Sequence, residues 1–253
     1  MQITKFTWVH IGQYGRCCVR NVNCHYVMRY HTNCFFPAGS ISDGGVWANT
    51  DLASDLADGT IDRPDPCALP GKELAFPYVF VGHEAFPLDT HVMRPYPRGQ
   101  LCDESRIFNY RLSRARRTIE NAFGILTARW QILHKPLRMK EQNADSLFHA
   151  LVVLHNFIMT AEESTDPNMR MYAPPTFIDV EEPDGTVREG EWRRNTSPYF
   201  EALGRVGGNR ANCTSYGLRD YLRGYFNSDI GYSQAPWQYD YACGRPYNPQ
   251  LYY

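Results

Sequence analysis

An imidazole and a carboxylate stand side by side at His83 and Glu84, directly after the extended apolar run LAFPYVFVG at residues 74–82. The apolar run predicts a buried strand, so the two polar groups are expected just past its end, where active sites are often built. Imidazole suits Mn²⁺ or Zn²⁺, whereas Mg²⁺ prefers oxygen ligands. The pair is therefore a candidate for metal chemistry.

A second candidate is Glu120, which lies in the arginine-rich helical pattern NYRLSRARRTIENAFGILTARW. Arg116, Glu120 and Gly124 are spaced by four residues, so they share one helix face. Glu120 is the only acid between Glu104 and Glu141. One interpretation is an ion-pairing surface glutamate, worth about half a kcal/mol. The other is a metal-binding carboxylate within a phosphate-binding surface, the arrangement that two-metal nucleases need.

The element expected to carry Glu120 is a long helix. Apolar residues recur every seven positions from Ser105 to about His134, and Pro136 ends the pattern. The stripe consists of Leu112, Ile119, Leu126 and Leu133, widened by Ala115, Ala122, Phe123 and Trp130. The helix should therefore bury one face and present its arginines elsewhere.

A second helix is predicted over residues 144–160 and is expected to be buried on most of its faces. Within it, His149 and His155 are interpreted as satisfied core histidines rather than ligands. A short helix over residues 51–57 is expected to be capped by Asn49 or Thr50.

The two ends of the chain are less regular. Residues 1–39 carry cysteines and histidines without the spacing of a zinc site, and their alternation favours one or two strands. After Ala161 the sequence is turn-rich, with one short amphipathic helix in GLRDYLRGYF and an aromatic end without periodicity, which indicates a wrapped or partly irregular tail. The predicted division is 1–39, a core of 40–160, and a tail of 161–253.

The composition is that of a globular protein, with 253 residues, 43% hydrophobic and 14% aromatic. The net charge is only -1, but residues 94–140 hold 11 Lys and Arg against Asp103, Glu104 and Glu120. Such a segment indicates a surface for a polyanion or a solvated helix face. No signal peptide and no run approaching the length of a membrane span is expected, so the eight cysteines are interpreted as reduced thiols of a soluble intracellular protein.

Longer motifs run in order from Ser40 to Gln238: SDGGVW, FPYVFVGHEAFPL, MRPYP, FNYRLSRARRTIENAFGILTARWQIL, ALVVLHNFI, GEWR, LRDYLRGYF and PWQ. In this order and spacing the sequence resembles the PIF/Harbinger family of DDE transposases and the domesticated nucleases derived from it. Residues 1–39 match the family poorly. The resemblance implies an α/β fold with an RNase H-like mixed sheet flanked by helices, incomplete at the N-terminus of this chain and followed by an irregular C-terminal tail.

The family's site, as the resemblance implies it, holds two divalent metal ions on three carboxylates and cleaves DNA. The third acid is the glutamate of R-x-x-E-x-x-F-G, which is Glu120 here. The second is the aspartate of V-G-D-E-A-F-P-L, and His83 stands at its place. The first lies in an I-D-G strand upstream of SDGGVW, and this chain begins too late to contain it. Asp43, within SDGGVW, is expected near the site but is not equated with the first acid.

Only one expected carboxylate is therefore at its place, which predicts lost or crippled catalysis. Glu84 could replace the missing ligand only through a local twist, because on a strand it points to the face opposite His83. Alternatively, His83 could suit Mn²⁺. The candidates for catalysis are Glu120 and His83, and those for binding Mg²⁺ or Mn²⁺ are these two with Glu84 and Asp43.

The partner implied by the resemblance is DNA, contacted through phosphates by Arg111, Arg114, Arg116, Arg117 and Arg129. A nuclear location and a separate Myb-like DNA-binding partner protein are implied as well. Three functions stay open: a metal-dependent nuclease, a non-catalytic DNA- or protein-binding remnant, and a decaying transposon copy that barely folds.

Overall fold

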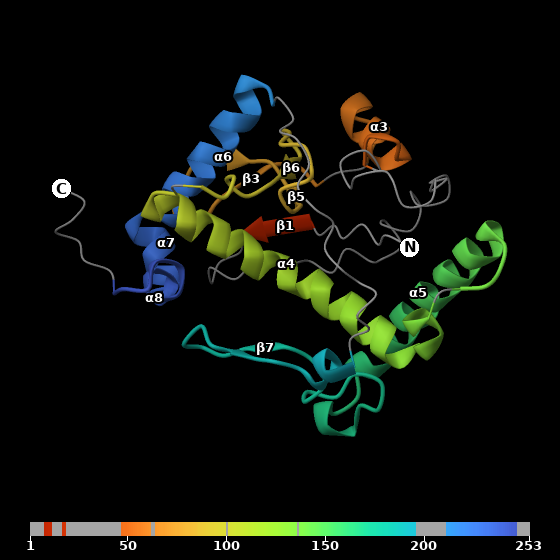
Figure 1. Ribbon diagram of the computed structural model, residues 1–253. Coiled ribbons are helices and arrows are strands. Elements are labelled where there is room, and N and C mark those ends of the chain that lie inside the picture. Colours follow the sequence, from red (N-terminus) through yellow and green to blue (C-terminus); the bar gives the residue numbers. More distant parts are fainter. Residues whose placement is uncertain are drawn as a thin grey trace. The chain divides into compact units, whose positions relative to one another are not determined.

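The computed structural model describes residues 8–11, 17–18, 47–61, 64–99, 101–135, 137–195 and 211–246. The described residues form two compact units: unit 1 comprises those up to residue 118 and those from residue 211 onward, and unit 2 comprises residues 119–195. The division falls inside α4 (Asp103–Arg129), which begins in unit 1 and ends in unit 2 (Figure 1). The division of the sequence at residues 39/40 and 160/161 stays a prediction.

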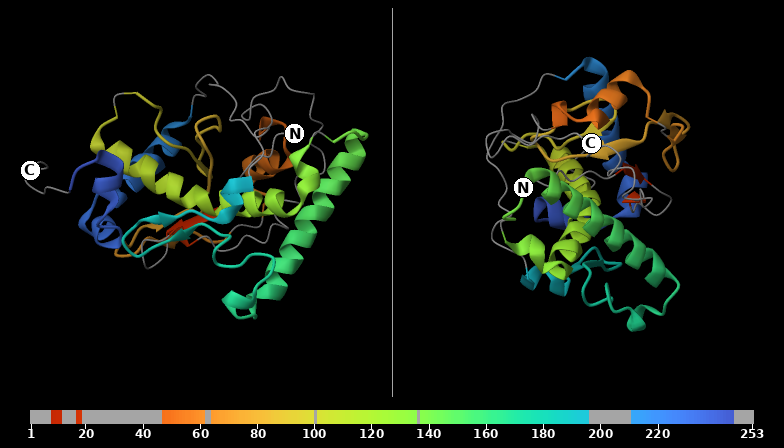
Figure 2. Two further views of the ribbon diagram at one scale, coloured as in Figure 1. Left: turned by 60° about the horizontal axis from the view of Figure 1, so that its bottom comes forward. Right: turned by 90° about the vertical axis from the view of Figure 1, so that its right-hand side faces the viewer.

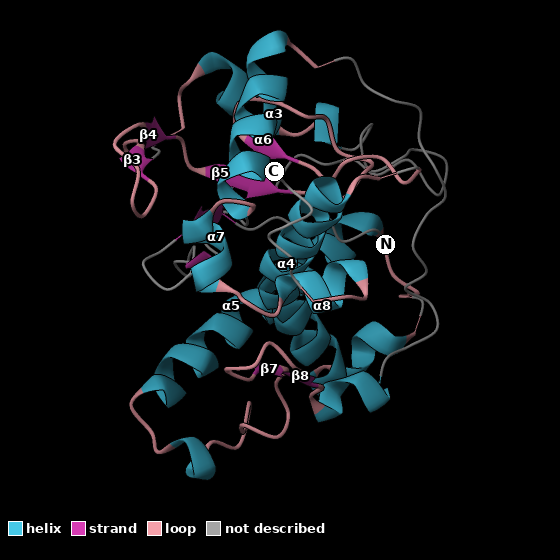
Figure 3. Cartoon of the chain, turned by 90° about the vertical axis from the view of Figure 1, so that its left-hand side faces the viewer, coloured by secondary structure: helices cyan, strands magenta, loops and turns pink. Residues whose placement is uncertain are grey.

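Unit 1 contains a mixed sheet with the strand order β2, β1, β5, β6. Strand β1 pairs antiparallel with β2 and with β5, whereas β5 and β6 run parallel. Strands β3 and β4 form a separate antiparallel pair. The bounds are β1 (Trp8–Ile11), β2 (Cys17–Cys18), β3 (Cys67–Ala68), β4 (Ala75–Phe76), β5 (Val79–Val81) and β6 (Val92–Met93). The described strands are short beside the helices (Figure 3). The predicted mixture of helices and strands is confirmed, and the RNase H-like sheet stays a prediction.

The strand predicted over residues 74–82 is present as two short strands, β4 and β5. Pro77 lies between them, and proline has no N–H to donate to a sheet, so it interrupts the ladder. All three residues of β5, Val79, Phe80 and Val81, are buried, as expected for a strand covered on both faces.

The short helix predicted after Asn49 is α3 (Asp51–Asp58). Its cap is Thr50, whose Oγ1 accepts a hydrogen bond from Ala53 N at 3.1 Å. Gly59 ends the helix with φ at 70°, a left-handed conformation that glycine adopts without strain. Local sequence signals therefore decide both ends of α3.

The short amphipathic helix predicted in GLRDYLRGYF is confirmed as part of α6 (Cys213–Phe226). The end of the chain, which was predicted to be irregular, instead forms α7 (Asp229–Gln234) and α8 (Gln238–Cys243). Leu222, Tyr225 and Phe226 of α6 belong to the core of unit 1 together with Ile107 and Phe108 of α4. Helices of six residues are too short to show a hydrophobic period, so α7 and α8 leave no pattern in the sequence.

Unit 2 contains the C-terminal part of α4 and a small core formed by Ile125, Ala173, Phe177 and Trp192. Its other elements are η1 (Gln131–His134), α5 (Glu141–Glu163), η2 (Pro167–Met169), β7 (Val180–Glu181), β8 (Val187–Arg188) and η3 (Glu191–Asn195). Strands β7 and β8 pair antiparallel as a hairpin. The turn-rich segment after Ala161 therefore packs onto the end of α4 rather than forming a loose tail.

Helix α5, one uninterrupted helix in Figure 2, is less buried than predicted. Val153, Leu154 and Phe157 are 50%, 43% and 71% exposed, while Phe148 and Leu151 are buried. The sequence predicted no membrane-spanning segment. Among the described residues, one helix, Gln142–Glu163, is nevertheless long and apolar enough to cross a membrane. This is weak evidence, because core helices of soluble proteins meet the same criteria.

His155 of α5 is a buried core histidine, as predicted. Trp130 Nε1 donates a hydrogen bond to the Tyr172 hydroxyl at 3.1 Å, and the His155 Nδ1 to Tyr172 oxygen distance is 2.8 Å. Because an indole N–H can only donate, the Tyr172 hydroxyl keeps its own proton for His155 Nδ1. Burial lowers the pKa of His155 to about 4, so the ring is neutral in the folded protein.

This buried histidine predicts an acid-sensitive fold. In the unfolded chain its pKa is near 6.5, so between pH 6.5 and about 4 the unfolded state takes up a proton that the folded state does not. The free energy of unfolding should fall by about 3 kcal/mol across this window.

Urea unfolding of the wild type and of His155→Leu at about pH 7.5 and about pH 4.5 measures this effect. Other titrating groups act in both proteins, so the difference between the two pH dependences isolates His155. Equal pH dependences in the two proteins would contradict the prediction.

Candidate functional site

His83 and Glu84 lie just past the end of β5, as predicted. They belong to a turn closed by a hydrogen bond from Phe86 N to His83 O at 3.1 Å. The His83 ring is half-buried and packs edge-on against the Phe86 ring, with centroids 4.8 Å apart, whereas Glu84 is exposed. Because the chain turns here, the alternation of side chains along a strand does not apply to this pair.

The hydrogen bonding of His83 decides what its ring can bind. Nδ1 accepts a hydrogen bond from Ala85 N at 3.2 Å. An accepting Nδ1 carries no proton, so the neutral ring holds its proton on Nε2. Neither nitrogen then offers a lone pair to a metal ion. His83 in this conformation does not fit the role of a metal ligand.

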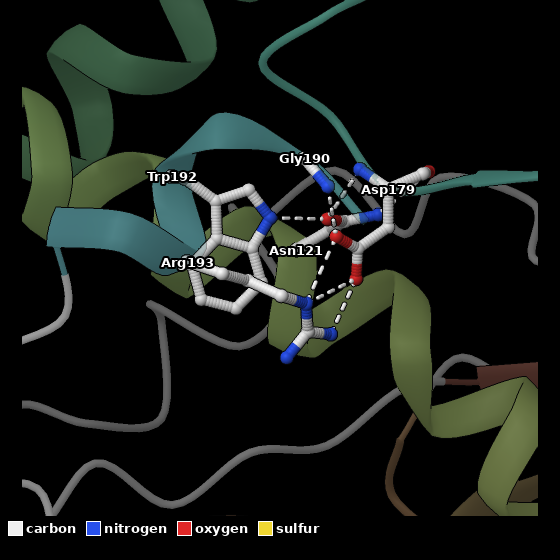
Figure 4. A network of polar contacts seen from close by, with 5 residues as sticks. All are labelled: Asn121, Asp179, Gly190, Trp192 and Arg193. Atoms are coloured by element: carbon white, nitrogen blue, oxygen red, sulfur yellow. Dashed lines mark hydrogen bonds and ion pairs between the residues drawn. The ribbon is translucent and has the colours of Figure 1, made fainter. Parts of the chain in front are cut away.

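Glu120 lies on the part of α4 that belongs to unit 2 and is half-buried. The next residue, Asn121, ties the helix to the segment before β7. Asp179 N donates to Asn121 Oδ1 at 3.0 Å, and Asn121 Nδ2 donates to the carbonyl oxygen of Asp179 at 3.1 Å. Trp192 Nε1 donates to the same Asn121 Oδ1 at 2.7 Å (Figure 4). The direction of α4 beside Glu120 is therefore held by three hydrogen bonds.

The carboxylate of Asp179 is the centre of this network. Its side chain is 0% exposed, and it accepts hydrogen bonds from Gly190 N at 2.8 Å and from the Arg193 guanidinium, Nε to Oδ1 at 3.0 Å (Figure 4). The pKa of Arg193 is raised, mainly by the hydrogen bond to Asp179, although burial alone would lower it. The negative charges of Asp179, Glu189 and Glu120 raise this pKa further. Arg193 is thus a cation whose charge interacts with Glu120.

Gly124, on the same predicted face as Glu120, is where Trp192 packs. A Cβ at position 124 would lie 2.2 Å from Trp192 Cε3 and 2.5 Å from Cδ2, so any side chain there would collide with the indole. Trp192 is itself buried. Gly124 of the motif R-x-x-E-x-x-F-G and Trp192 of the motif GEWR therefore pack directly against each other.

Sequence reasoning did not assign roles to Asn121, Asp179, Trp192 and Arg193. The signals were the asparagine next to Glu120 and the GEWR motif, but their pairing joins positions 58 and 71 residues apart. No periodicity connects such positions, so only the fold could show the contact.

Two of the five arginines assigned to DNA are engaged within the protein. Arg111 is buried: its Nε donates to Gln238 Oε1 at 2.8 Å and its Nη2 to the carbonyl oxygen of Gly231 at 2.6 Å. A phosphate contact does not fit this position, and we correct that prediction. Arg129 is exposed, but its Nε donates to the carbonyl oxygen of Tyr172. Its guanidinium carbon lies 4.1 Å from the centroid of the Phe177 ring.

The other three arginines, Arg114, Arg116 and Arg117, are half-buried on α4. Arg114 Nη1 donates to the Tyr110 hydroxyl at 3.1 Å. Arg117 Nη1 is buried without a hydrogen-bond acceptor among the described residues. Their phosphate contacts stay a prediction.

The candidate metal residues are distributed over the chain. His83 and Glu84 belong to unit 1, and Glu120 belongs to unit 2. Asp43 lies outside the described residues. The part of the chain that the structure describes contains no group of three or more His, Cys, Asp and Glu placed to hold a metal ion.

The sequence model of the DDE superfamily endonuclease matches residues 31–156, a span that includes His83, Glu84 and Glu120. The match supports a DDE transposase-type domain, and with it a nuclease derived from a transposase. Such endonucleases generally use divalent metal ions and act on DNA. No curated protein and no solved structure matches the chain.

A two-metal site needs several oxygen ligands around the ions. In the described residues, Glu120 offers a carboxylate, whereas His83 offers a ring whose Nδ1 is taken by Ala85 N. These residues do not fit the metal pair of a DDE enzyme. No reaction step is therefore derived through metal ions.

Proposed function

We propose that the chain is a transposase-derived DDE domain of the PIF/Harbinger type that binds DNA and whose metal-dependent cleavage is lost or severely weakened. The observation that carries the proposal is the state of His83. This residue stands in the span matched by the DDE family, and the resemblance assigns it to the place of the second acid. Its imidazole cannot replace two carboxylate oxygens for Mg²⁺, and its Nδ1 already accepts the Ala85 N–H.

DNA binding in this proposal is supported by the basic segment at residues 94–140 and by the family match. Arg114, Arg116 and Arg117 are the arginines of α4 that the proposal assigns to phosphate. Contacts of this kind release counterions, so affinity for a duplex of arbitrary sequence should fall steeply as salt is raised. The nuclear location and the Myb-like partner protein belong to the proposal through the resemblance alone.

The test is nicking of supercoiled DNA in Mg²⁺ and in Mn²⁺ by the wild type, Glu120→Ala and His83→Asp. The wild type is expected to nick no faster than Glu120→Ala, because neither has a complete set of acidic ligands. Circular dichroism must show that all three proteins are folded.

The outcomes separate the candidate functions. Nicking by the wild type that disappears in Glu120→Ala would overturn the loss of catalysis and establish an active nuclease. Nicking gained by His83→Asp would show that residue 83 alone limits the site. Folded protein that neither nicks nor retards DNA in a gel would contradict the DNA-binding half of the proposal and favour a protein-binding remnant.

A further inference from the structure

Helix α5 carries an apolar stripe that the described residues leave uncovered. Leu147, Ala150, Leu154, Phe157 and Ala161 follow one another at alternating spacings of three and four residues, which places them on one face of the helix. Leu154 and Phe157 are 43% and 71% exposed, and both alanines are exposed as well. A contiguous exposed apolar surface of this kind marks an interaction site. These five residues are called the α5 stripe.

The opposite face of α5 holds the helix in unit 2. Phe148, Leu151 and Val152 are buried, and His155 Nδ1 lies 2.8 Å from the Tyr172 hydroxyl oxygen. The α5 stripe therefore cannot turn inward without breaking these contacts. The same contacts argue against a membrane span, because a spanning helix would have to leave the core of unit 2.

The spacing of the α5 stripe is that of an interface between two helices. Apolar residues at alternating intervals of three and four form the seam of a coiled coil, in which each side chain inserts between four residues of the facing helix. From Ser146 to Ala161 the sequence holds no Asp, Glu, Lys or Arg, so a facing helix would not desolvate such a charge. The stripe extends over about four turns, or about 21 Å.

The charges at the two ends of α5 indicate which helix faces the stripe. The segment before the stripe is net positive, and the segment after it is net negative. The first holds Lys135, Arg138 and Lys140 against Glu141 and Asp145, and the second holds Glu162, Glu163 and Asp166 against Arg170. A second copy of α5 in antiparallel orientation would place the positive end of each helix beside the negative end of the other. A parallel copy would place like charges together.

One antiparallel register satisfies both the stripe and the charges. When Ala150 faces Leu154 of the second copy, a small residue meets a large one, and Leu147 faces Phe157 in the next layer. In the same register Lys140 lies opposite the last turn of α5, which carries Glu163. Because an antiparallel pair of identical helices has two-fold symmetry, each of these contacts forms twice.

We propose that α5 is a dimerisation helix, which pairs in antiparallel orientation with α5 of a second copy of this chain. A lipid surface fits the stripe less well, because the acidic residues after it would face anionic headgroups. The interface involves residues of unit 2 and does not depend on DNA binding or on cleavage.

The test is sedimentation equilibrium of the full chain at loading concentrations from about 2 to about 200 μM, which bracket the micromolar dissociation constant expected of a small interface. The wild type should change from monomer to dimer over this range. Leu154→Glu should weaken dimerisation by at least about 100-fold, because the symmetric interface would bury the new charge twice. Circular dichroism checks that the variant is folded, which is expected because Leu154 is exposed.

The matched control is Leu74→Glu, the same change at an exposed leucine outside α5. Leu74 lies in unit 1 and is 65% exposed. This variant should dimerise like the wild type. Phe157→Glu is a second change within the α5 stripe and should act like Leu154→Glu, which it replaces if Leu154→Glu does not fold.

Charge reversal tests the orientation of the two helices. Lys140→Glu should weaken the dimer by about threefold or more, and adding Glu163→Lys to the same chain should restore it. In a parallel pair each of these residues would face its own counterpart, so neither variant would change the dissociation constant. Unchanged constants in both variants would overturn the antiparallel pairing.

Other results would overturn the dimer itself. A wild type that stays monomeric at every loading would do so, and so would a dimer that neither Leu154→Glu nor Phe157→Glu weakens. Co-sedimentation of a monomer with phosphatidylglycerol vesicles, lost in Leu154→Glu, would instead assign the α5 stripe to a lipid surface. None of these outcomes depends on whether the protein binds or nicks DNA.

Discussion

Replacing Asp179 by alanine is expected to lower the free energy of unfolding by about 2–3 kcal/mol, because a buried backbone N–H and a charged guanidinium lose their acceptor. The carboxylate is 0% exposed and accepts hydrogen bonds from Gly190 N and Arg193. Alanine would leave both donors without this acceptor: Gly190 N in a buried position, and the guanidinium of Arg193, whose side chain is 32% exposed.

Guanidinium chloride unfolding followed by circular dichroism measures the loss. The matched control is Glu182→Ala, which removes an acid from the neighbouring hairpin. There, Arg188 Nε lies 3.7 Å from Glu182 Oε1, and both side chains are about half exposed. That exposed pair should contribute less than about 1 kcal/mol. Similar losses in the two variants would show that the Asp179 network does not stabilise unit 2 more than a surface ion pair does.

Replacing Gly124 by alanine should also destabilise the protein, by about 2–3 kcal/mol, although alanine is normally the better residue within a helix. The new Cβ would stand 2.2 Å from the buried ring of Trp192, which is rigid and cannot move aside without losing its hydrogen bond to Asn121. The collision should outweigh the gain of about 1 kcal/mol in helix propensity.

The control uses another helical glycine. Gly217 of α6 has no atom within 4 Å of an added Cβ, so Gly217→Ala should be neutral or stabilising. Opposite signs for the two substitutions would establish the collision as the cause. Combining Gly124→Ala with Trp192→Leu should recover part of the loss, because the two residues share one contact. A stabilising Gly124→Ala would contradict the packing described for Trp192.

Both predictions concern the surroundings of Glu120. Asn121 and Gly124, on the same turn of α4, are fixed from one side by Asp179, Trp192 and Arg193. The carboxylate of Glu120, which the resemblance assigns to the third metal ligand, is thus carried by a stretch of helix with little freedom to rotate. Rigid support of this kind is what a site needs for accurate positioning.

Short-range features of the protein could be predicted from the sequence. The stripe from Leu112 to Leu126 defined the buried face of α4, and the apolar run ending at Gly82 placed His83 and Glu84 past a strand. The start of α3 was predicted at Asn49 or Thr50, and Thr50 is its cap. These predictions succeed because periodicity, capping and apolar runs act within one or two turns of chain. The assignment of His83 to the place of the family's second acid rests on the motif around it and stays a prediction.

The contacts between positions that are distant in the sequence were decided by the tertiary structure alone. Arg111 has the sequence context of a DNA-binding arginine, but the partners that bury it, Gly231 and Gln238, come from the end of the chain. Likewise, no sequence pattern relates Asp179 and Arg193 to α4, because only the folded hairpin brings this pair to Asn121. Burial and ion pairing depend on which segments of the chain pack together. That packing is stabilised by the whole hydrophobic core rather than by any local pattern.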